Sequence, residues 1–331
     1  MAFKYRLLIS IAFLFLYSCK KDLILQTGVS SNKKGYKIAF GDTKKIYLMN
    51  PDGSNVEELV DASPVSGYVS WNEKAEYVYF SSTKGENEDA WEAFRVNIKT
   101  KVLTKISNFD KDVRSLGVSP DGNTLAISVM TGNSSIGNNN NNLTQFSTNL
   151  YVVPMSLVES RITSGGYIQM NDLTPIQSAP NSDQFWFEEL NWNHDASNPI
   201  LAYTKTWRYD EDNVSFTHVY TIKPDGSENT LIAKNKDQPI WNFDNNKIMF
   251  LDLSYYDYVD NSIKKIKVNS ILKEVSGGSF SPNGGNYVLF EIGDENRKAG
   301  IAKYLIGDTQ GVKLKTKVEV YEPRWSPMIV P

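Results

Sequence analysis

The stretch that decides the fold is residues 46–80, IYLMNPDGSNVEELVDASPVSGYVSWNEKAEYVYF. It contains two short apolar segments joined by a Pro-Asp-Gly-Ser turn, then a loop, then two further apolar segments, the first of which ends in Trp71. Aspartate accepts hydrogen bonds from the amides of a turn and glycine adopts a positive φ, so such a turn joins adjacent antiparallel strands. The stretch therefore predicts strands of two successive sheets, with a boundary near residue 65.

The same pattern recurs down the chain. An apolar or aromatic residue closes a short strand, a turn rich in Ser, Asn, Pro or Gly follows, and a second apolar strand begins. The closing residues, here called the anchors, are Trp71, Val118, Trp192, Trp241, Phe280 and Trp325. They are separated by 47, 74, 49, 39 and 45 residues, and four of these spacings match the length of a four-stranded blade. The long spacing indicates an insertion, which includes five consecutive asparagines at 138–142.

The first and last apolar segments of the predicted propeller are expected to belong to one blade. Trp325 has no strand after it, whereas the apolar segment 36–40 has no anchor before it. One blade is therefore expected to take its innermost strand from the C-terminal end and its other three strands from the N-terminal end. Such closure removes the exposed edge of an open array. The sequence thus predicts an all-β fold with very little helix: a six-bladed β-propeller over residues 35–331.

The strands of a blade are denoted A (inner) to D (outer). In the blade that begins at Val118, the D strand is expected at 168–174. In the blade that begins at Trp241, the C and D strands are expected at 262–268 and 271–275. The tryptophan anchors are expected to pack between neighbouring blades, because an indole buries 150–250 Å².

The N-terminal segment has the features of an export signal. Lys4 and Arg6 precede an apolar run, 7–17, that is too short to span a bilayer. The run ends in Leu-Tyr-Ser-Cys, which resembles a bacterial lipobox, and Cys19 is the only cysteine in the chain, so no intrachain disulfide can form. We predict that residues 1–18 are a lipoprotein signal peptide, that Cys19 is lipidated, and that residues 19–34 are a tether. The alternative is an ordinary signal peptide with a chance cysteine.

The predicted address is the outer membrane, facing the periplasm or the cell surface. Lys20 and Lys21 differ from the aspartate signal that retains some lipoproteins at the inner membrane. The Lys-Lys-Asp start also resembles surface-export signals of Bacteroidetes-type lipoproteins. The net charge of −3, without a basic patch, argues against nucleic acid as a partner.

Residues 46–55, followed by Trp71 and the apolar strand 77–80, resemble the β-propeller repeat of TolB-type proteins. Parts of the repeat return at 118–127, 222–227 and 324–327. The resemblance implies a six-bladed propeller that works by binding, as a protein-interaction scaffold of the cell envelope. It implies no particular partner, because no partner-binding motif is found.

Residues suited to catalysis are few. The chain has two histidines, His194 and His218, which are expected on opposite faces of the disc or on separate levels. No Gly-x-Ser-x-Gly nucleophile elbow exists, and two histidines cannot supply the metal-binding cluster of the oligogalacturonate lyases, whose repeat is similar. The acidic clusters 210–212 and 257–260 lack the spacing of a calcium loop. We therefore expect no metal, no cofactor and no enzymatic activity.

Aromatic residues gather in the segments assigned to the long B-to-C and D-to-A connections, which share one face of a propeller. With one arginine they are Trp91, Phe185, Trp186, Trp207, Arg208, Tyr209, Tyr255, Tyr256 and Tyr258. Because such residues anchor binding hot spots and loops carry binding sites, we predict that this face binds an envelope protein, a peptide or a glycan. The alternative is that these residues cover the blade edges and plug the channel.

A second functional hypothesis is a glycan-binding or glycan-active component, a lyase or hydrolase, of a carbohydrate-uptake system. A pair of Asp or Glu residues about 5–10 Å apart across the channel would favour glycosidase chemistry. An apolar, aromatic channel mouth without such a pair would favour binding.

Overall fold

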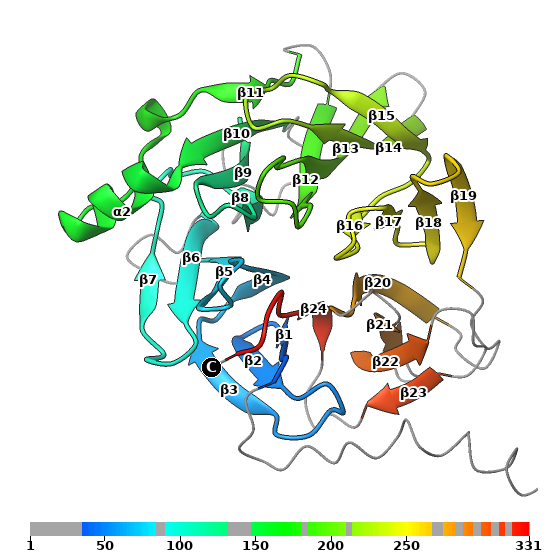
Figure 1. The fold of residues 1–331 in the computed structure, drawn as a ribbon. Helices are drawn as coiled ribbons and strands as arrows, with labels where there is room; N and C mark the ends of the chain where they lie inside the picture. The colour runs from blue at the N-terminus through cyan, green and yellow to red at the C-terminus, as the bar shows by residue number, and fades with distance from the viewer. Residues whose placement is uncertain are drawn as a thin grey trace, which may run out of the picture. The chain divides into compact units, whose positions relative to one another are not determined.

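Six four-stranded antiparallel sheets are arranged in a ring, as predicted (Figure 1). The computed structural model describes residues 35–83, 90–131, 147–180, 184–209, 214–266, 274–282, 287–293, 299–305, 311–314 and 320–330. The predicted signal peptide, Cys19 and the tether lie outside the described residues, as does the asparagine run at 138–142.

The sheets are numbered here as blades I to VI, each given from its inner to its outer strand. Blade I is β24 (Tyr321–Trp325), β1 (Ile38–Gly41), β2 (Lys45–Met49) and β3 (Glu57–Asp61); blade II is β4 (Val65–Trp71), β5 (Tyr77–Ser82), β6 (Glu92–Asn97) and β7 (Leu103–Lys105). Blade III is β8 (Val113–Val118), β9 (Thr124–Met130), β10 (Thr148–Pro154) and β11 (Pro175–Gln177); blade IV is β12 (Gln184–Trp192), β13 (Leu201–Tyr209), β14 (Val214–Ile222) and β15 (Thr230–Lys234). Blade V is β16 (Ile240–Trp241), β17 (Lys247–Met249), β18 (Ser254–Asp257) and β19 (Ser262–Lys265); blade VI is β20 (Glu274–Phe280), β21 (Tyr287–Gly293), β22 (Ala299–Leu305) and β23 (Gly311–Leu314).

Blade I closes the ring in the predicted manner. β24 pairs antiparallel with β1, placing Ile38 opposite Trp325 and Ala39 opposite Arg324. β1 is fully buried, and its Ile38 and Phe40 share a core with Leu289 of blade VI. The junction between the two ends of the chain is thus an interior element, which hides the backbone edges that an open sheet would expose.

The residue after each anchor is a serine or an asparagine, and its side-chain oxygen accepts a hydrogen bond from a backbone N–H at the start of strand B. We call this bond the latch. In each pair below, the backbone N–H of the first residue donates to the side-chain oxygen of the second: Tyr77 to Asn72 (2.8 Å), Thr124 to Ser119 (3.0 Å), Ile200 to Asn193 (2.9 Å), Lys247 to Asn242 (2.7 Å), Tyr287 to Ser281 (3.1 Å) and Lys37 to Ser326 (2.9 Å). All six blades therefore join their two inner strands in one way, including blade I, where no turn connects them.

Two tryptophan anchors also bond across the seams between blades. The indole N–H of Trp71 donates to the carbonyl of Arg324 (3.2 Å), and that of Trp192 donates to the carbonyl of Gly117 (2.9 Å). Each acceptor directly precedes the anchor of the preceding blade. A side chain at Gly117 would press on the Trp192 ring, since an added Cβ would lie 3.4 Å from Cδ1. The predicted packing of tryptophans between blades is thus confirmed.

Blade III differs from the prediction. Its outer strand is β11 rather than residues 168–174, and a helix, α2 (Met155–Thr163), and a 3₁₀ turn, η1 (Met170–Asp172), precede it. Ile168 instead forms a parallel bridge with Ser107. The helix was missed although Met155, Val158 and Ile162 follow a helical spacing; the first two are buried against the core shared with blade II. Among the described residues, no helix is long and apolar enough to cross a membrane.

Blade V also differs. Its C and D strands are β18 and β19, so the prediction of 262–268 and 271–275 was wrong; residue 275 belongs to the inner strand β20. The reason is a tight connection after β17. Leu253 takes a positive φ of 59°, and Asp252 accepts a hydrogen bond from the backbone of Ser254 (3.2 Å).

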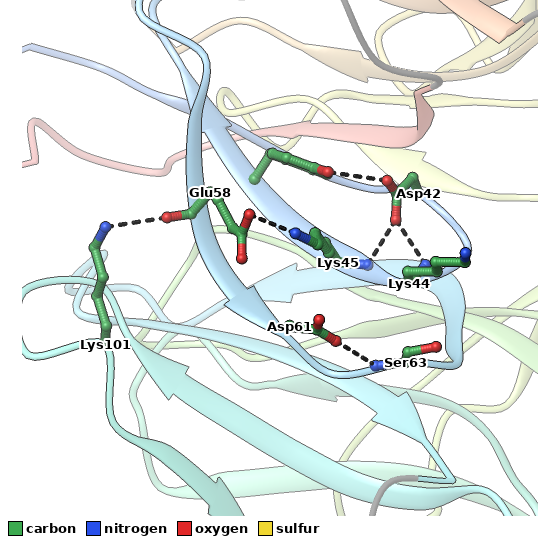
Figure 2. Close-up of polar contacts among 8 residues, drawn as sticks. Asp42, Lys44, Lys45, Glu58, Asp61, Ser63 and Lys101 are labelled. Atoms are coloured by element: carbon green, nitrogen blue, oxygen red, sulfur yellow. Dashed lines mark hydrogen bonds and ion pairs between the residues drawn. The ribbon is translucent and has the colours of Figure 1, made fainter.

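Polar contacts hold the outer strand of blade I (Figure 2). The Lys45 ammonium lies 2.7 Å from Glu58 Oε2 on β3, and Lys101 from the C-to-D turn of blade II donates to the Glu58 carbonyl (3.0 Å). At the start of β2, Asp42 accepts hydrogen bonds from the Lys44 and Lys45 amides, both at 2.6 Å. An exposed ion pair contributes about 0–1 kcal/mol, so these contacts set the position of an edge strand more than they stabilise the fold.

A comparison of two tryptophan substitutions tests the seams. Trp192→Phe removes the bond to Gly117, whereas Trp241→Phe removes a buried indole N–H that has no partner among the described residues. We expect Trp192→Phe to lower the free energy of unfolding by about 1–3 kcal/mol more than Trp241→Phe. Urea unfolding of both variants measures this, and equal losses would contradict the role of the indole bond.

The latch of blade I is tested by Ser326→Ala, with Ser119→Ala as its matched control. Both remove one latch, but only in blade I are strands A and B not joined by a turn. Ser326→Ala is expected to cost about 1–3 kcal/mol and to accelerate hydrogen exchange throughout β1. Ser119→Ala should leave the amides of β9 better protected, because the turn keeps the strands together; similar exchange in β1 and β9 would argue against the latch.

Candidate functional site

The inner strands of all six blades line one channel. The space between them is about 860 Å³, part of it open to solvent. Its lining includes the anchors Trp71, Val118, Trp192, Trp241 and Trp325 and residues on both sides of them. Because the strands of a blade alternate in direction, the A-to-B and C-to-D turns share one face, here the turn face, and the other connections share the opposite face, here the loop face.

The channel mouth on the turn face is formed by residues two positions after the anchors. Those that line the channel are Glu73, Pro120, His194, Phe243 and Pro327. The His194 ring stacks on Phe243, with centroids 4.0 Å apart and planes inclined by 14°. Its Nδ1 lies 3.7 Å from Glu73 Oε2, which belongs to a blade two positions away. An acid, an imidazole and an aromatic ring from three blades thus converge at this mouth.

The inner strand of blade IV adds a second carboxylate to the channel. Glu189 has a positive φ of 58°, at an irregularity in the pairing of β12 with β13. Its Oε2 accepts hydrogen bonds from the Thr204 hydroxyl (2.6 Å) and from the Gln238 backbone N–H (2.5 Å). Glu189 therefore fastens blade IV to the connection that leads into blade V, a structural role.

Several buried polar atoms along the channel have no hydrogen-bond partner within the described part of the chain. They are His194 Nδ1, Gln238 Oε1, Trp241 Nε1 and Trp325 Nε1. Nearly all buried polar groups of a folded protein are paired, so a concentration of unpaired atoms marks the least satisfied region of the interior. A channel with such a lining can exchange hydrogen bonds with a bound polar group after small side-chain movements.

Blade IV brings together five residues of the predicted aromatic face. Phe185 and Trp186 lie in β12, and Trp207, Arg208 and Tyr209 lie in β13. Phe185 pairs with Trp207 across the two strands, and their rings stack with centroids 6.3 Å apart. The prediction of loops was wrong here, because the hairpin pairing continues through these residues to the end of β13.

The other four residues lie elsewhere. Trp91 precedes β6 in blade II, and its backbone N–H donates to Asp112 Oδ1 (3.1 Å). Tyr255 and Tyr256 lie in β18, not in a B-to-C loop, and Tyr258 lies in the turn after it. Tyr258 stacks on Trp241 with centroids 5.3 Å apart, in the core shared by blades IV and V. Tyr256 packs against the same core, and Tyr255 packs against the core shared by blades V and VI. All three tyrosines therefore cover a blade core, as the alternative interpretation held.

The two histidines have different surroundings. His194 lies at the channel mouth, whereas His218 is buried in β14, with its ring edge against Trp207 (4.7 Å) and its Nδ1 facing the Asn235 N–H (3.4 Å). Within the described ranges, no three His, Cys, Asp or Glu residues are placed to hold a metal ion. Asp257 and Asp260 instead contact Lys264 at 2.9 and 2.5 Å. The acidic cluster 210–212 lies outside the described residues.

Sequence reasoning missed the channel mouth. Glu73, His194 and Phe243 have no motif of their own, and their common signal is position: each lies two residues after an anchor. The repeat gives the number of blades, and the same alignment also predicts which side chains meet at the axis.

No protein-family model matches this sequence, and no curated protein matches it. Solved structures do. TolB from Acinetobacter baumannii matches with a TM-score of 0.62 and 15% identity, over 91% of this chain and 69% of that one. A structure assigned as TolB from Agrobacterium tumefaciens matches with a TM-score of 0.56 and 12% identity, over 88% and 92%. Hydrazine synthase from Kuenenia stuttgartiensis matches with a TM-score of 0.61 and 12% identity, over 90% of this chain and 48% of that one. The likeness is one of fold: this chain is a six-bladed β-propeller of the kind found in TolB.

Proposed function

We propose that this protein is a lipid-anchored binding scaffold of the cell envelope, without catalytic activity, and that it engages a polypeptide segment at the channel mouth of the turn face. The observation that carries the proposal is the meeting of Glu73, His194 and Phe243 at that mouth. The N-terminal lipobox resemblance supports the anchor, and the fold shared with TolB structures supports a propeller that works by binding.

The chemistry of the mouth favours a polypeptide ligand. Phe243, Pro120 and Pro327 supply apolar surface, and the neighbouring Met328 and Ile329 are 45% and 49% exposed. Apolar and aromatic surface at the centre of a patch, with polar groups beside it, is the usual composition of a protein-binding site. The carboxylate of Glu73 and the imidazole of His194 can exchange hydrogen bonds with a peptide backbone at the same place.

The carboxylates of the channel favour binding over glycosidase chemistry. Glu73 lies two residues beyond its anchor, on the turn-face side, whereas Glu189 lies three residues before its anchor. At roughly 3.3 Å per residue, these positions are on the order of 15 Å apart along the channel axis, beyond the separation that glycosidases use. Glu189 is also occupied by two hydrogen bonds. A glycan-binding role remains the second hypothesis, since aromatic surface also suits sugars.

Photo-crosslinking in intact cell envelopes tests the site. Benzoylphenylalanine replaces Phe243 at the mouth in one variant and Lys99, an exposed residue on the rim of the turn face, in a control. We expect a protease-sensitive adduct of defined mass from position 243 alone, because only that side chain lies at the channel mouth. Equal adducts from both positions, or none, would contradict a ligand at the mouth, and an adduct that resists proteases and carries sugar would favour the glycan hypothesis.

The lipid anchor is tested separately. Cys19→Ser removes the only thiol of the chain, so the variant should take up no labelled palmitate and should be released from washed membranes. Ser18→Ala, next to it, keeps the thiol and should behave as the native protein. If Cys19→Ser stays with the membranes, the protein is attached by something other than a lipid on Cys19. That result would favour the alternative of an ordinary signal peptide.

A further inference from the structure

The hairpin of β13 and β14 is long for this fold. Its strands pair continuously, from Leu201 opposite Ile222 to Tyr209 opposite Val214. In blade IV, Leu201 lies opposite the anchor Trp192, and strand B continues from there to Tyr209. In blade V, Ile248 lies opposite the anchor Trp241, and strand B ends one residue later at Met249. At about 3.4 Å per residue, the blade IV hairpin projects roughly 20 Å further toward the loop face than the hairpin of blade V.

The projecting part carries a stack of three rings, one from each of three adjacent strands. Phe185 stacks on Trp207 with centroids 6.3 Å apart and planes at 14°, and Trp207 stacks on Phe216 at 5.6 Å and 23°. Phe216, at the outer end of the stack, is 36% exposed. We call Phe185, Trp207 and Phe216 the aromatic ladder.

A lysine lies on the same side of the sheet as the ladder. The Lys205 ammonium is 5.3 Å from the ring centroid of Phe185, 5.7 Å from those of Trp207 and Tyr220, and 5.9 Å from that of Phe187. Within the residues that the structure describes, the Lys205 ammonium is paired with no carboxylate and donates to no hydrogen-bond acceptor. Partial burial lowers the pKa of Lys205. By contrast Lys303, which is also half-buried, donates to the carbonyl of Pro51 (3.2 Å).

Among the described residues this half-buried ammonium has only aromatic neighbours, and that arrangement is incomplete. Ring faces attract a cation, but they do not replace the oxygen acceptors that an ammonium loses when it leaves water. A carboxylate supplied from outside would complete it with a charge-assisted hydrogen bond. The ligand chemistry that complements Lys205 is therefore anionic, and the ladder beside it requires an apolar group on the same ligand.

We propose that the aromatic ladder and Lys205 dock an acidic peptide segment in which a carboxylate lies next to an apolar or aromatic side chain. The carboxylate pairs with Lys205 and the apolar side chain packs against Phe216 and Trp207. A peptide fits better than a sugar, because the rings of the ladder already cover one another's faces and leave mainly edges for contact. The surface lies on the loop face, so it is separate from the channel mouth and does not depend on the function proposed for that mouth.

The test measures charge selectivity with two synthetic peptides, acetyl-Phe-Glu-Phe-Glu-Phe-amide and its neutral counterpart with Gln in place of Glu. Both are titrated into the full-length protein in detergent by calorimetry. We expect the native protein to bind the Glu peptide about tenfold more tightly than the Gln peptide. Lys205→Gln should bring this ratio to about one, and Lys205→Arg should keep it. Phe216→Ala should weaken the binding of both peptides alike.

Control variants make the result specific. Lys99→Gln removes one exposed positive charge from the turn face, on the opposite side of the disc, and should leave the ratio unchanged. Phe243→Ala, at the channel mouth, should also leave it unchanged, so the two sites can fail independently. A ratio near one in the native protein, or an unaltered ratio in folded Lys205→Gln, overturns the proposal. Lys205-dependent binding of oligogalacturonate without binding of the Glu peptide would overturn the assignment to a peptide.

Discussion

The structure depends on one hydrogen bond repeated six times, the latch between the residue after each anchor and the amide at the start of strand B. It fixes the direction in which the chain leaves the inner strand, and so it also fixes the position of the residue that follows the latch residue. That next residue stands at the channel mouth in blades II to V and in blade I. The latch residues are all Ser or Asn, whereas the residues after them are Glu, Pro, His, Phe and Pro, with a further Pro in blade VI. The latch is therefore the same in every blade, whereas the side chains that it places around the channel mouth differ in chemistry.

The two faces of the disc differ for a physical reason. On the turn face the connections are short and are stabilised by side chains of their own residues, as where Asp225 accepts from the Ser227 backbone (2.9 Å) and Gly226 takes a φ of 83°. Hydrogen bonds from Ser227 lower the pKa of Asp225, which keeps this acceptor ionised. On the loop face the connections vary, and the blade IV hairpin extends by continued pairing. The turn face thus carries short connections around the channel mouth, whereas on the loop face the strands of different blades extend to different lengths.

Much of the fold could be predicted from the sequence because the repeat encodes it. The anchors identified all six inner strands, and the unmatched ends identified blade I. The errors arose where local chemistry overrides the pattern. A positive φ at Leu253 turns the chain directly after β17, so strand C of blade V begins at Ser254, eight residues before its predicted start at 262. Phe185 and Trp207 were assigned to loops because aromatic residues far from an anchor carry no signal of cross-strand pairing. The site was harder still: the convergence of Glu73 and His194 joins residues 121 positions apart, and only the ring geometry brings them together.

The closure of blade I has a consequence for the order of folding. β1 and β24 are separated by nearly the whole chain, so their pairing is the most non-local of the strand pairings that the structure describes and carries the largest loop-closure cost among them. The other five blades consist of neighbouring segments and can form as each is completed. Until residues 321–325 are present, the sheet of β1, β2 and β3 keeps an unpaired and wholly apolar edge. During synthesis this unpaired edge is a template for pairing with another chain, and the last strand that protects it also completes the wall of the channel.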